Sequence, residues 1–265
     1  MGQTLVLALV FFAISTLFSM IGMGGGILYV PILLFAGFTF KQAPAISLIL
    51  ISATSLAALF TFWRNRRVDW KLALVIDPPT DVMAFVGGYF SALVPEAVLR
   101  GILVAVLIVA GTLMLKGGAG RRDGERRPSG WWYWHRDFNG ESYFVNLPLV
   151  LTATAMVGLL SGMLGITGGI IKLPIMVLLC GVPMDIAVAT STVMVAVTAL
   201  SGLAGHALNA GVDWRIGLVL AGAAVIGGLL GSRVSLDMDK KRLKKIFGVV
   251  VWVIALKMAW QLWGG

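Results

Sequence analysis

The stretch Gly22-Met23-Gly24-Gly25-Gly26-Ile27-Leu28-Tyr29-Val30-Pro31 recurs 143 residues later as Gly165-Ile166-Thr167-Gly168-Gly169-Ile170-Ile171-Lys172-Leu173-Pro174. Each copy lies inside a long apolar segment. Glycine frees the backbone from helical geometry, and in hydrocarbon a non-helical backbone is tolerated only where it is buried in protein or lines a cavity. The duplication and the nearby prolines favour two breaks in membrane helices over glycines that only allow close helix packing.

The composition is that of a protein embedded in a membrane. Of the 265 residues, 58% are hydrophobic and 12% are charged, and apolar runs of membrane-spanning length recur from end to end. The net charge of +9 comes from basic residues clustered in a few loops, which is typical of cytoplasmic loops and not of a nucleic-acid interface. The single cysteine, Cys180, excludes an intramolecular disulfide. Soluble enzymes and nucleic-acid partners are therefore excluded.

The duplication extends well beyond the glycine motif. Past the motif the offset becomes 144 residues, and Ala43, Ser47 and Thr54 align with Ala187, Ser191 and Thr198. Val68-Asp69-Trp70 likewise aligns with Val212-Asp213-Trp214, and each Asp is expected to cap a helix. We therefore divide the chain into a first membrane repeat (1–115), a basic and aromatic cytoplasmic linker (116–146) and a second membrane repeat (147–265).

Each repeat is predicted to contain one glycine-broken segment and three ordinary spans. The broken segments are 4–37 and 147–181, and the spans are 42–62, 72–90, 96–115, 184–206, 214–232 and 241–262. As one unbroken helix, the first segment would be roughly 50 Å long against a hydrocarbon core of roughly 30 Å.

Basic loops set the expected orientation. Lys and Arg residues near 63–71, in the linker and near 233–245 indicate that these three regions face the cytoplasm. Segment 147–181 must then return to its starting side, as a hairpin or a re-entrant pair of half-helices. The predicted fold is an all-α polytopic membrane protein with two inverted repeats and both termini outside.

The linker carries a turn signal. Asn139-Gly140 lies between aromatic-rich flanks, which predicts a β-hairpin. We interpret it as an interfacial hairpin with aromatic anchors, and a protein-recognition module is the alternative.

The two breaks are the first candidate site. A half-helix that begins near Gly26 or Gly169 directs N–H groups with partial positive charge toward the middle of the membrane, where they can bind an anion. Lys172 stands where the first copy has Tyr29 and could attract an anion, or could instead extend to the membrane surface. The candidate substrate-binding residues at the breaks are Gly24, Gly25, Gly26, Thr167, Gly168, Gly169 and Lys172.

Hydroxyl groups follow at helical spacing. Ser47 and Thr54, like Ser191 and Thr198, are seven residues apart and share a helix face. Substrate contact by Ser47 and Ser191 and ordinary interhelical hydrogen bonding both explain them.

Two carboxylates are expected inside a span. Asp77 and Asp81 are four residues apart on one helix face, and their counterparts Ala221 and Val225 are apolar. An ionised group there needs water or a partner, so we predict a proton-coupling or cation-binding role. The alternative is pairing with a nearby Arg or Lys, or a position near the cytoplasmic surface, with Asp77 the more interfacial of the two. No nucleotide-binding loop or metal-ligand spacing occurs, so no cofactor, metal or enzymatic activity is expected.

On these motifs the sequence resembles the sulfite exporter TauE/SafE family of membrane permeases. The residues that carry the resemblance are Gly22, Gly24, Gly25, Gly26, Pro31, Gly165, Gly168, Gly169 and Pro174, together with the repeated Val-Asp-Trp. The resemblance implies a transporter of small anions such as sulfite, sulfoacetate and related organosulfonates. The chain departs from the family pattern at Thr167, Lys172, the Asp77–Asp81 stretch and the long linker.

These observations predict a secondary transporter that exports a small sulfur-containing or carboxylate anion across a bacterial inner membrane, coupled to the proton gradient. Its partners would be the anionic substrate and the lipid bilayer, and a homodimer is an open alternative. A channel-like or accessory protein in a larger assembly is the alternative function. Alternating access requires the pair of inverted breaks, whereas a scaffold does not.

Overall fold

The computed structural model describes residues 2–22, 24, 26–116, 130–166, 168–209, 212–236, 249 and 251–260. Two candidate site residues, Gly25 and Thr167, lie outside this set. The first repeat contains α1 (Gly2–Ser19), α2 (Gly26–Phe35), α3 (Ala43–Arg64), α4 (Trp70–Ile76), α5 (Pro78–Phe90), the 3-10 turn η1 (Ser91–Leu93) and α6 (Glu96–Lys116). The second contains α7 (Leu147–Leu164), α8 (Gly169–Pro174), the π-helical η2 (Ile175–Leu179), α9 (Met184–Asn209), α10 (Trp214–Ser235) and a helix over Val251–Trp260.

Four helices of the described chain are long and apolar enough to cross a membrane. They are Ala43–Arg64, Leu147–Leu164, Met184–Leu208 and Trp214–Ser235. With the other apolar helices they form an all-α membrane-embedded body.

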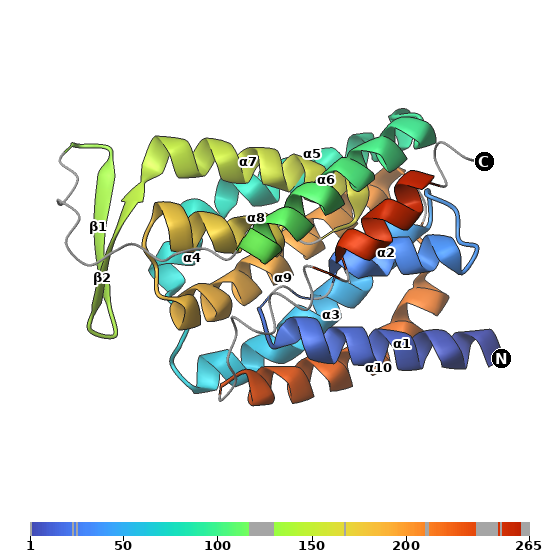
Figure 1. Cartoon of the computed structure of the whole chain (residues 1–265), viewed down its shortest axis with the longest axis horizontal. Coiled ribbons are helices and arrows are strands. Elements are labelled where there is room, and N and C mark those ends of the chain that lie inside the picture. The colour runs from blue at the N-terminus through green and yellow to red at the C-terminus, as the bar shows by residue number, and fades with distance from the viewer. Residues whose placement is uncertain are drawn as a thin grey trace.

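Both glycine motifs interrupt a helix, as the sequence predicts. Between α1 and α2, Gly22 and Gly24 have φ angles of 71° and 64°, and Gly165 ends α7 with a φ of 65°. These left-handed angles favour glycine, since other residues rarely adopt them. In Figure 1, α1 runs from right to left and α2 runs back toward the right, so segment 4–37 reverses its direction at the break and is not a single span.

The predicted span 72–90 is also interrupted. Pro78 and Pro79 lack the N–H groups that would continue the hydrogen-bond ladder, and α4 ends before Asp77 while α5 begins after it. Asp77 therefore lies at a helix junction.

The two repeats interlock. Helix α5 packs between α7 and α9 of the second repeat, and its counterpart α10 packs between α1 and α3 of the first. Helices α3 and α9, which are also counterparts, contact each other. Close approach depends on glycine, because a Cβ at Gly162 of α7 would overlap the carbonyl of Ala84 in α5. Each helix pair formed between the repeats therefore has a counterpart: α5 with α7 and α9 corresponds to α10 with α1 and α3.

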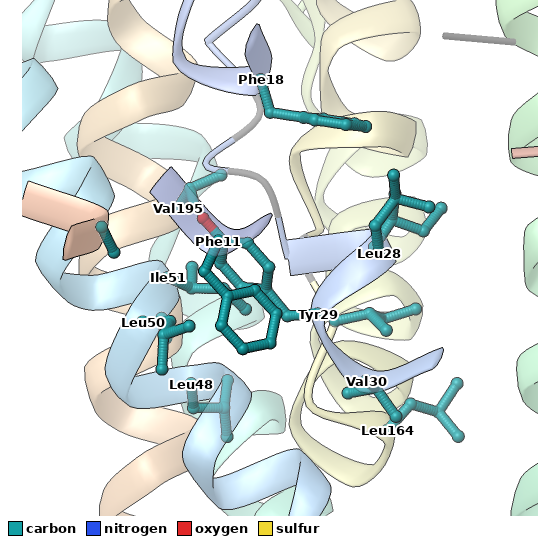
Figure 2. Packing of buried hydrophobic residues seen from close by; sticks show 14 of the residues in the cluster. Phe11, Phe18, Leu28, Tyr29, Val30, Leu48, Leu50, Ile51, Leu164 and Val195 are labelled. Carbon is teal, nitrogen blue, oxygen red and sulfur yellow. The ribbon is translucent and has the colours of Figure 1, made fainter. Parts of the chain in front are cut away.

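The helices surround a continuous apolar core. Figure 2 shows Phe11 of α1 beside Tyr29 of α2, with Leu50 and Ile51 of α3 close by. The Phe11 and Tyr29 rings meet edge to face with centroids 5.3 Å apart. This core holds the broken first segment against α3.

A β-hairpin stands at one end of the molecule (Figure 1). Strands β1 (Tyr133–Phe138) and β2 (Glu141–Asn146) pair antiparallel, with Tyr133 opposite Asn146 and Phe138 opposite Glu141. The turn residues Asn139 and Gly140 both have positive φ, at 52° and 80°, as an Asn-Gly hairpin turn requires. We call this end, where α3 ends and α4 and α7 begin, the hairpin end, and the opposite end the far end.

Candidate functional site

The two breaks are tied to the opposite repeats. The Ser47 hydroxyl of α3 donates to the Gly165 carbonyl at 2.6 Å, and the Ser191 hydroxyl of α9 donates to the Gly22 carbonyl at 2.8 Å. Both serines are fully buried. The structure therefore brings Ser47 and Ser191 to the breaks, as interhelical bonds that satisfy the carbonyls freed there. A role for them in substrate contact stays a prediction.

The glycines at the start of each break lie directly on that same opposite helix. A Cβ at Gly22 would overlap the Val188 carbonyl of α9, and a Cβ at Gly165 would overlap Cα of Pro44 in α3. Pro44 and Val188 are counterparts in the repeat. Each broken segment is thus seated on the third helix of the other repeat, and only glycine fits at the contact.

The remaining described glycines of the motif are buried within the bundle. Gly24 and Gly26 lie at the first break, and Gly168 and Gly169 lie at the second. A Cβ at Gly168 would meet only side-chain atoms, Ser161 Oγ and Val157 Cγ1, both at 2.9 Å. Helices α2 and α8 begin at Gly26 and Gly169. The N–H groups of a first helical turn carry partial positive charge, which favours a bound anion.

A charged network spans three helices beside the second break. The buried Lys172 ammonium of α8 forms an ion pair with Asp77 and donates to the Thr198 hydroxyl of α9 at 2.8 Å. Thr198 in turn donates to the Asp81 carboxylate of α5 at 2.8 Å. Because the network contains two carboxylates and one ammonium, it carries one excess negative charge when all three groups are ionised.

Asp77 is only 4% exposed, while Asp81 is partly exposed. The junction between α4 and α5 places Asp77 against Lys172, so the alternative of pairing with a nearby Lys holds for Asp77. The more interfacial position of Asp77 in the membrane stays a prediction. The alternative in which Lys172 extends to the membrane surface is wrong, since its side chain is fully buried.

The first repeat holds a neutral version of the same arrangement. Tyr29, the counterpart of Lys172, is fully buried and its hydroxyl lies 3.1 Å from the Thr54 hydroxyl, the counterpart of Thr198. Both threonines align in the sequence, but the candidate site named only Ser47 and Ser191 of the same helix faces. The signal in the sequence is that both halves carry a polar residue three positions after the last glycine of the break, Tyr29 or Lys172. Both halves also carry a threonine, Thr54 or Thr198, at the equivalent position of the next long helix.

The hairpin is fastened to the helices through Asp69. The Asp69 carboxylate caps α4 by accepting from the N–H groups of Lys71 and Leu72, each at 3.1 Å. It also accepts from Arg136 Nε and Nη2 at 2.9 and 3.0 Å, and from the Tyr143 hydroxyl. The cap could be predicted from the sequence, whereas the partners Arg136 and Tyr143 could not, because they lie 67 and 74 residues away in the linker.

The charge on Asp69 is stabilised by these contacts. Burial alone would raise the pKa of the Asp69 carboxyl, but hydrogen bonds from Arg136, Tyr143 and the Leu72 N–H bring the pKa below its ordinary value. Because the pKa is lower in the folded state, the ionised Asp69 carboxylate stabilises the folded protein. This stabilisation is fully present above the ordinary Asp pKa of about 4 and is lost as the pH falls through the lowered pKa. The Asp69–Arg136 contact should therefore persist throughout the neutral range.

No group of three or more His, Cys, Asp or Glu side chains that could hold a metal ion occurs among the residues that the structure describes. Near the breaks, the described residues offer glycine N–H groups, hydroxyls and the Lys172–Asp77 pair.

The fold with its two helix breaks is that of a multi-pass helical membrane protein, and comparison with known proteins identifies the class as a membrane transporter. The model of the sulfite exporter TauE/SafE family matches residues 7–258, so the chain belongs to that family. No solved protein structure matches the chain.

Curated relatives cover nearly the whole chain. The probable membrane transporter protein YunE of Bacillus subtilis is 29% identical over 93% of this chain and 94% of its own length. YfcA of Escherichia coli, described in the same words, is 28% identical over 100% of this chain and 93% of its own. A probable membrane transporter protein of Methanocaldococcus jannaschii is 26% identical over 96% and 94% of the two chains.

Proposed function

We propose that this protein is a secondary transporter that exports a small anion across the bacterial inner membrane in exchange for, or together with, protons. Sulfite, sulfoacetate and related organosulfonates or carboxylates are the substrate class. The observation that carries the proposal is that each break is hydrogen-bonded to a helix of the other repeat, through Ser47 at the second break and Ser191 at the first. Two half-helix N-termini with partial positive charge, buried in the bundle, suit an anion.

The opposite directions of corresponding helices support an inverted repeat. In Figure 1, α1 runs toward the hairpin end and its counterpart α7 runs away from it, and α10 and α5 likewise run in opposite directions. Exposed basic residues at the hairpin end support a cytoplasmic position for that end; they include Arg64, Arg66, Arg67, Lys71 and Arg233.

Reporter fusions test this orientation. A reporter that works only outside the cytoplasm should be active when it is fused to either terminus. A reporter that works only in the cytoplasm should be active when it is inserted in the linker. The linker fusion is the internal control for expression. A cytoplasmic C-terminus would contradict the inverted topology.

Flux in proteoliposomes tests the substrate class. We expect the protein to increase the flux of sulfite or sulfoacetate over that in protein-free liposomes. Taurine should move more slowly, since its ammonium group cancels the sulfonate charge. Equal flux with and without protein for every anion would contradict anion export.

Asp81 is the proposed coupling residue. Lys172 compensates Asp77, whereas Asp81 is partly exposed and reaches Lys172 only through Thr198, so the proton can be exchanged most readily at Asp81. Asp81→Asn keeps an oxygen acceptor for Thr198 but cannot ionise. We expect it to abolish the response of flux to an imposed pH gradient while substrate binding is retained.

The matched control is Asp185→Asn, which neutralises an exposed carboxylate in the first turn of α9. Substrate flux and internal pH are measured in the same liposomes. Normal proton-driven flux in Asp81→Asn would show that Asp81 is a structural partner of Thr198, and protonation of the substrate itself would then explain any pH dependence.

A further inference from the structure

An open crevice at the far end has a filled counterpart at the hairpin end. The crevice has a volume of about 330 Å³ and is lined by Thr4, Leu7, Ala36, Gly37, Phe38, Gln42, Ile216 and Leu220. The duplication pairs these residues with Leu147, Val150, Cys180, Gly181, Val182, Ile186, Leu72 and Ile76. Gly37 and Gly181 both have positive φ, at 93° and 72°, which supports the alignment at this turn.

The hairpin fills the counterpart crevice. Tyr143 and Val145 of β2 are 1% and 0% exposed and belong to one apolar cluster with Val150, Cys180 and Ile186. The N–H of Phe144 also donates to the Cys180 carbonyl at 3.2 Å. The same crevice is therefore open at one end of the protein and occupied by two linker side chains at the other.

A second far-end cavity, of about 150 Å³, is lined in part by Met163, Ser91 and His206. Their counterparts at the hairpin end are Met20, Ser235 and Phe62. Ser235 donates to the Met20 carbonyl at 2.6 Å and Phe62 is 1% exposed, so these three counterparts are buried. The counterparts of three further lining residues, Val94, Glu96 and Leu99, lie outside the described residues.

We propose that the β1–β2 hairpin is the gate of the hairpin end in the transport cycle, and that it withdraws Tyr143 and Val145 when this end opens. The proposal rests on the proposed transport function, since a transporter that works by alternating access between two inverted repeats must open each end in turn. The structure then corresponds to the state that is open at the far end. A two-stranded hairpin has little stability of its own, so its position depends on contacts that can be broken.

The gate is connected to the charged network by a short helix. Asp69 caps the start of α4 and accepts hydrogen bonds from Arg136 and Tyr143. Asp77 follows the last residue of α4 and forms the ion pair with Lys172. A change at Asp77 can therefore displace the hairpin anchor through seven residues of helix. The geometry assigns Arg136 and Tyr143 a positioning role.

Labelling of Cys180 tests whether the hairpin opens. Cys180 is the only cysteine in the chain, and it is fully buried beneath the hairpin, so maleimide reaction of the whole protein in detergent reports one position. Arg136→Gln and Asp69→Asn each remove the bidentate charge-assisted contact, and each should raise the labelling rate at least about tenfold. The matched control Arg100→Gln alters an exposed arginine of α6 that pairs with Glu96 and should leave the rate unchanged.

Size-exclusion profiles and circular dichroism establish that the variants remain folded. Unchanged labelling in both folded variants would overturn the proposal, as would wild-type labelling as fast as that of the denatured chain. The labelling result does not depend on which anion is transported.

Cross-linking tests whether opening is needed for transport. The Asn139 side chain donates to the Arg66 carbonyl at 3.0 Å, so Arg66→Cys with Asn139→Cys in a Cys180→Ser background can be joined by a short bismaleimide. Flux should fall at least about tenfold in the cross-linked protein and not in either single-cysteine variant after the same treatment. Undiminished flux after complete cross-linking would show that the hairpin is a fixed cover. If the wild-type protein moves no anion, the proposed function fails, and Cys180 labelling alone decides whether the hairpin opens.

Discussion

Replacing Lys172 by methionine should destabilise the protein severely, because the Asp77 carboxylate would remain buried without its cation. Asp77 is 4% exposed and its ion pair with Lys172 is inside the bundle. Breaking one side of a buried ion pair costs about 3–5 kcal/mol. The expected result is a large fall in the apparent Tm in detergent and in the yield of monodisperse protein.

The double variant Asp77→Asn with Lys172→Met separates folding from transport. Replacing both charges leaves no buried ion unpaired, so most of the stability should return. If the ammonium also attracts the anion, the folded double variant should need more than about tenfold more substrate for half-maximal flux, equivalent to about 1.4 kcal/mol.

Tyr29→Phe is the matched control in the first repeat. It removes the hydroxyl that meets Thr54 and should cost only about 1 kcal/mol, since no charge is left uncompensated. A Lys172→Met protein as stable as wild type would contradict the buried ion pair. Wild-type substrate affinity in the double variant would restrict Lys172 to a structural role.

Substituting alanine for Gly165 or Gly22 should also prevent stable assembly. Each residue has a left-handed φ, which costs a residue with a side chain about 1–3 kcal/mol, and in each the added Cβ would overlap backbone atoms of the opposite repeat. Backbone in a packed helix cannot move aside as a side chain can. We expect both variants to lose transport and to yield little folded protein.

Two controls isolate the contact from the mere loss of glycine. A Cβ at Gly101 or Gly222 would meet nothing within 4 Å, so Gly101→Ala and Gly222→Ala should behave as wild type. Gly168, whose Cβ would meet only side-chain atoms, should tolerate alanine better than Gly165 does. Wild-type stability in Gly165→Ala would show that the break is not seated on α3 as described.

Features that depend on local chemistry could be predicted from the sequence. The helix breaks follow from glycine dihedral freedom, the hairpin turn from Asn139-Gly140, and the cap of α4 from Asp69, because each involves only neighbouring residues. The duplicated motif also indicated that the two halves share one architecture, and hydropathy indicated a membrane protein.

The contacts that organise the candidate site could not be predicted in the same way. Ser47 and Gly165 are 118 residues apart, and Lys172 and Asp77 are 95 apart. Both Asp77 and Lys172 had several plausible surroundings in the sequence, namely water, the membrane surface or an ion pair. Only the tertiary arrangement that brings the Lys172 side chain of α8 to Asp77 at the α4–α5 junction selects the ion pair.

The sequence by itself determined that this chain is a membrane protein with a duplicated glycine break, because apolar run lengths, glycine and proline act over a few residues. Tertiary structure alone decided that each break rests on the opposite repeat, that Lys172 forms an ion pair with Asp77, and that Tyr143 and Val145 of the linker hairpin are buried against the helices. The physical reason is that hydrogen bonds and ion pairs between distant segments depend on which helix faces meet. That choice is made by the packing of the whole bundle, where close glycine contacts such as that of Gly162 with Ala84 allow one arrangement of the helices.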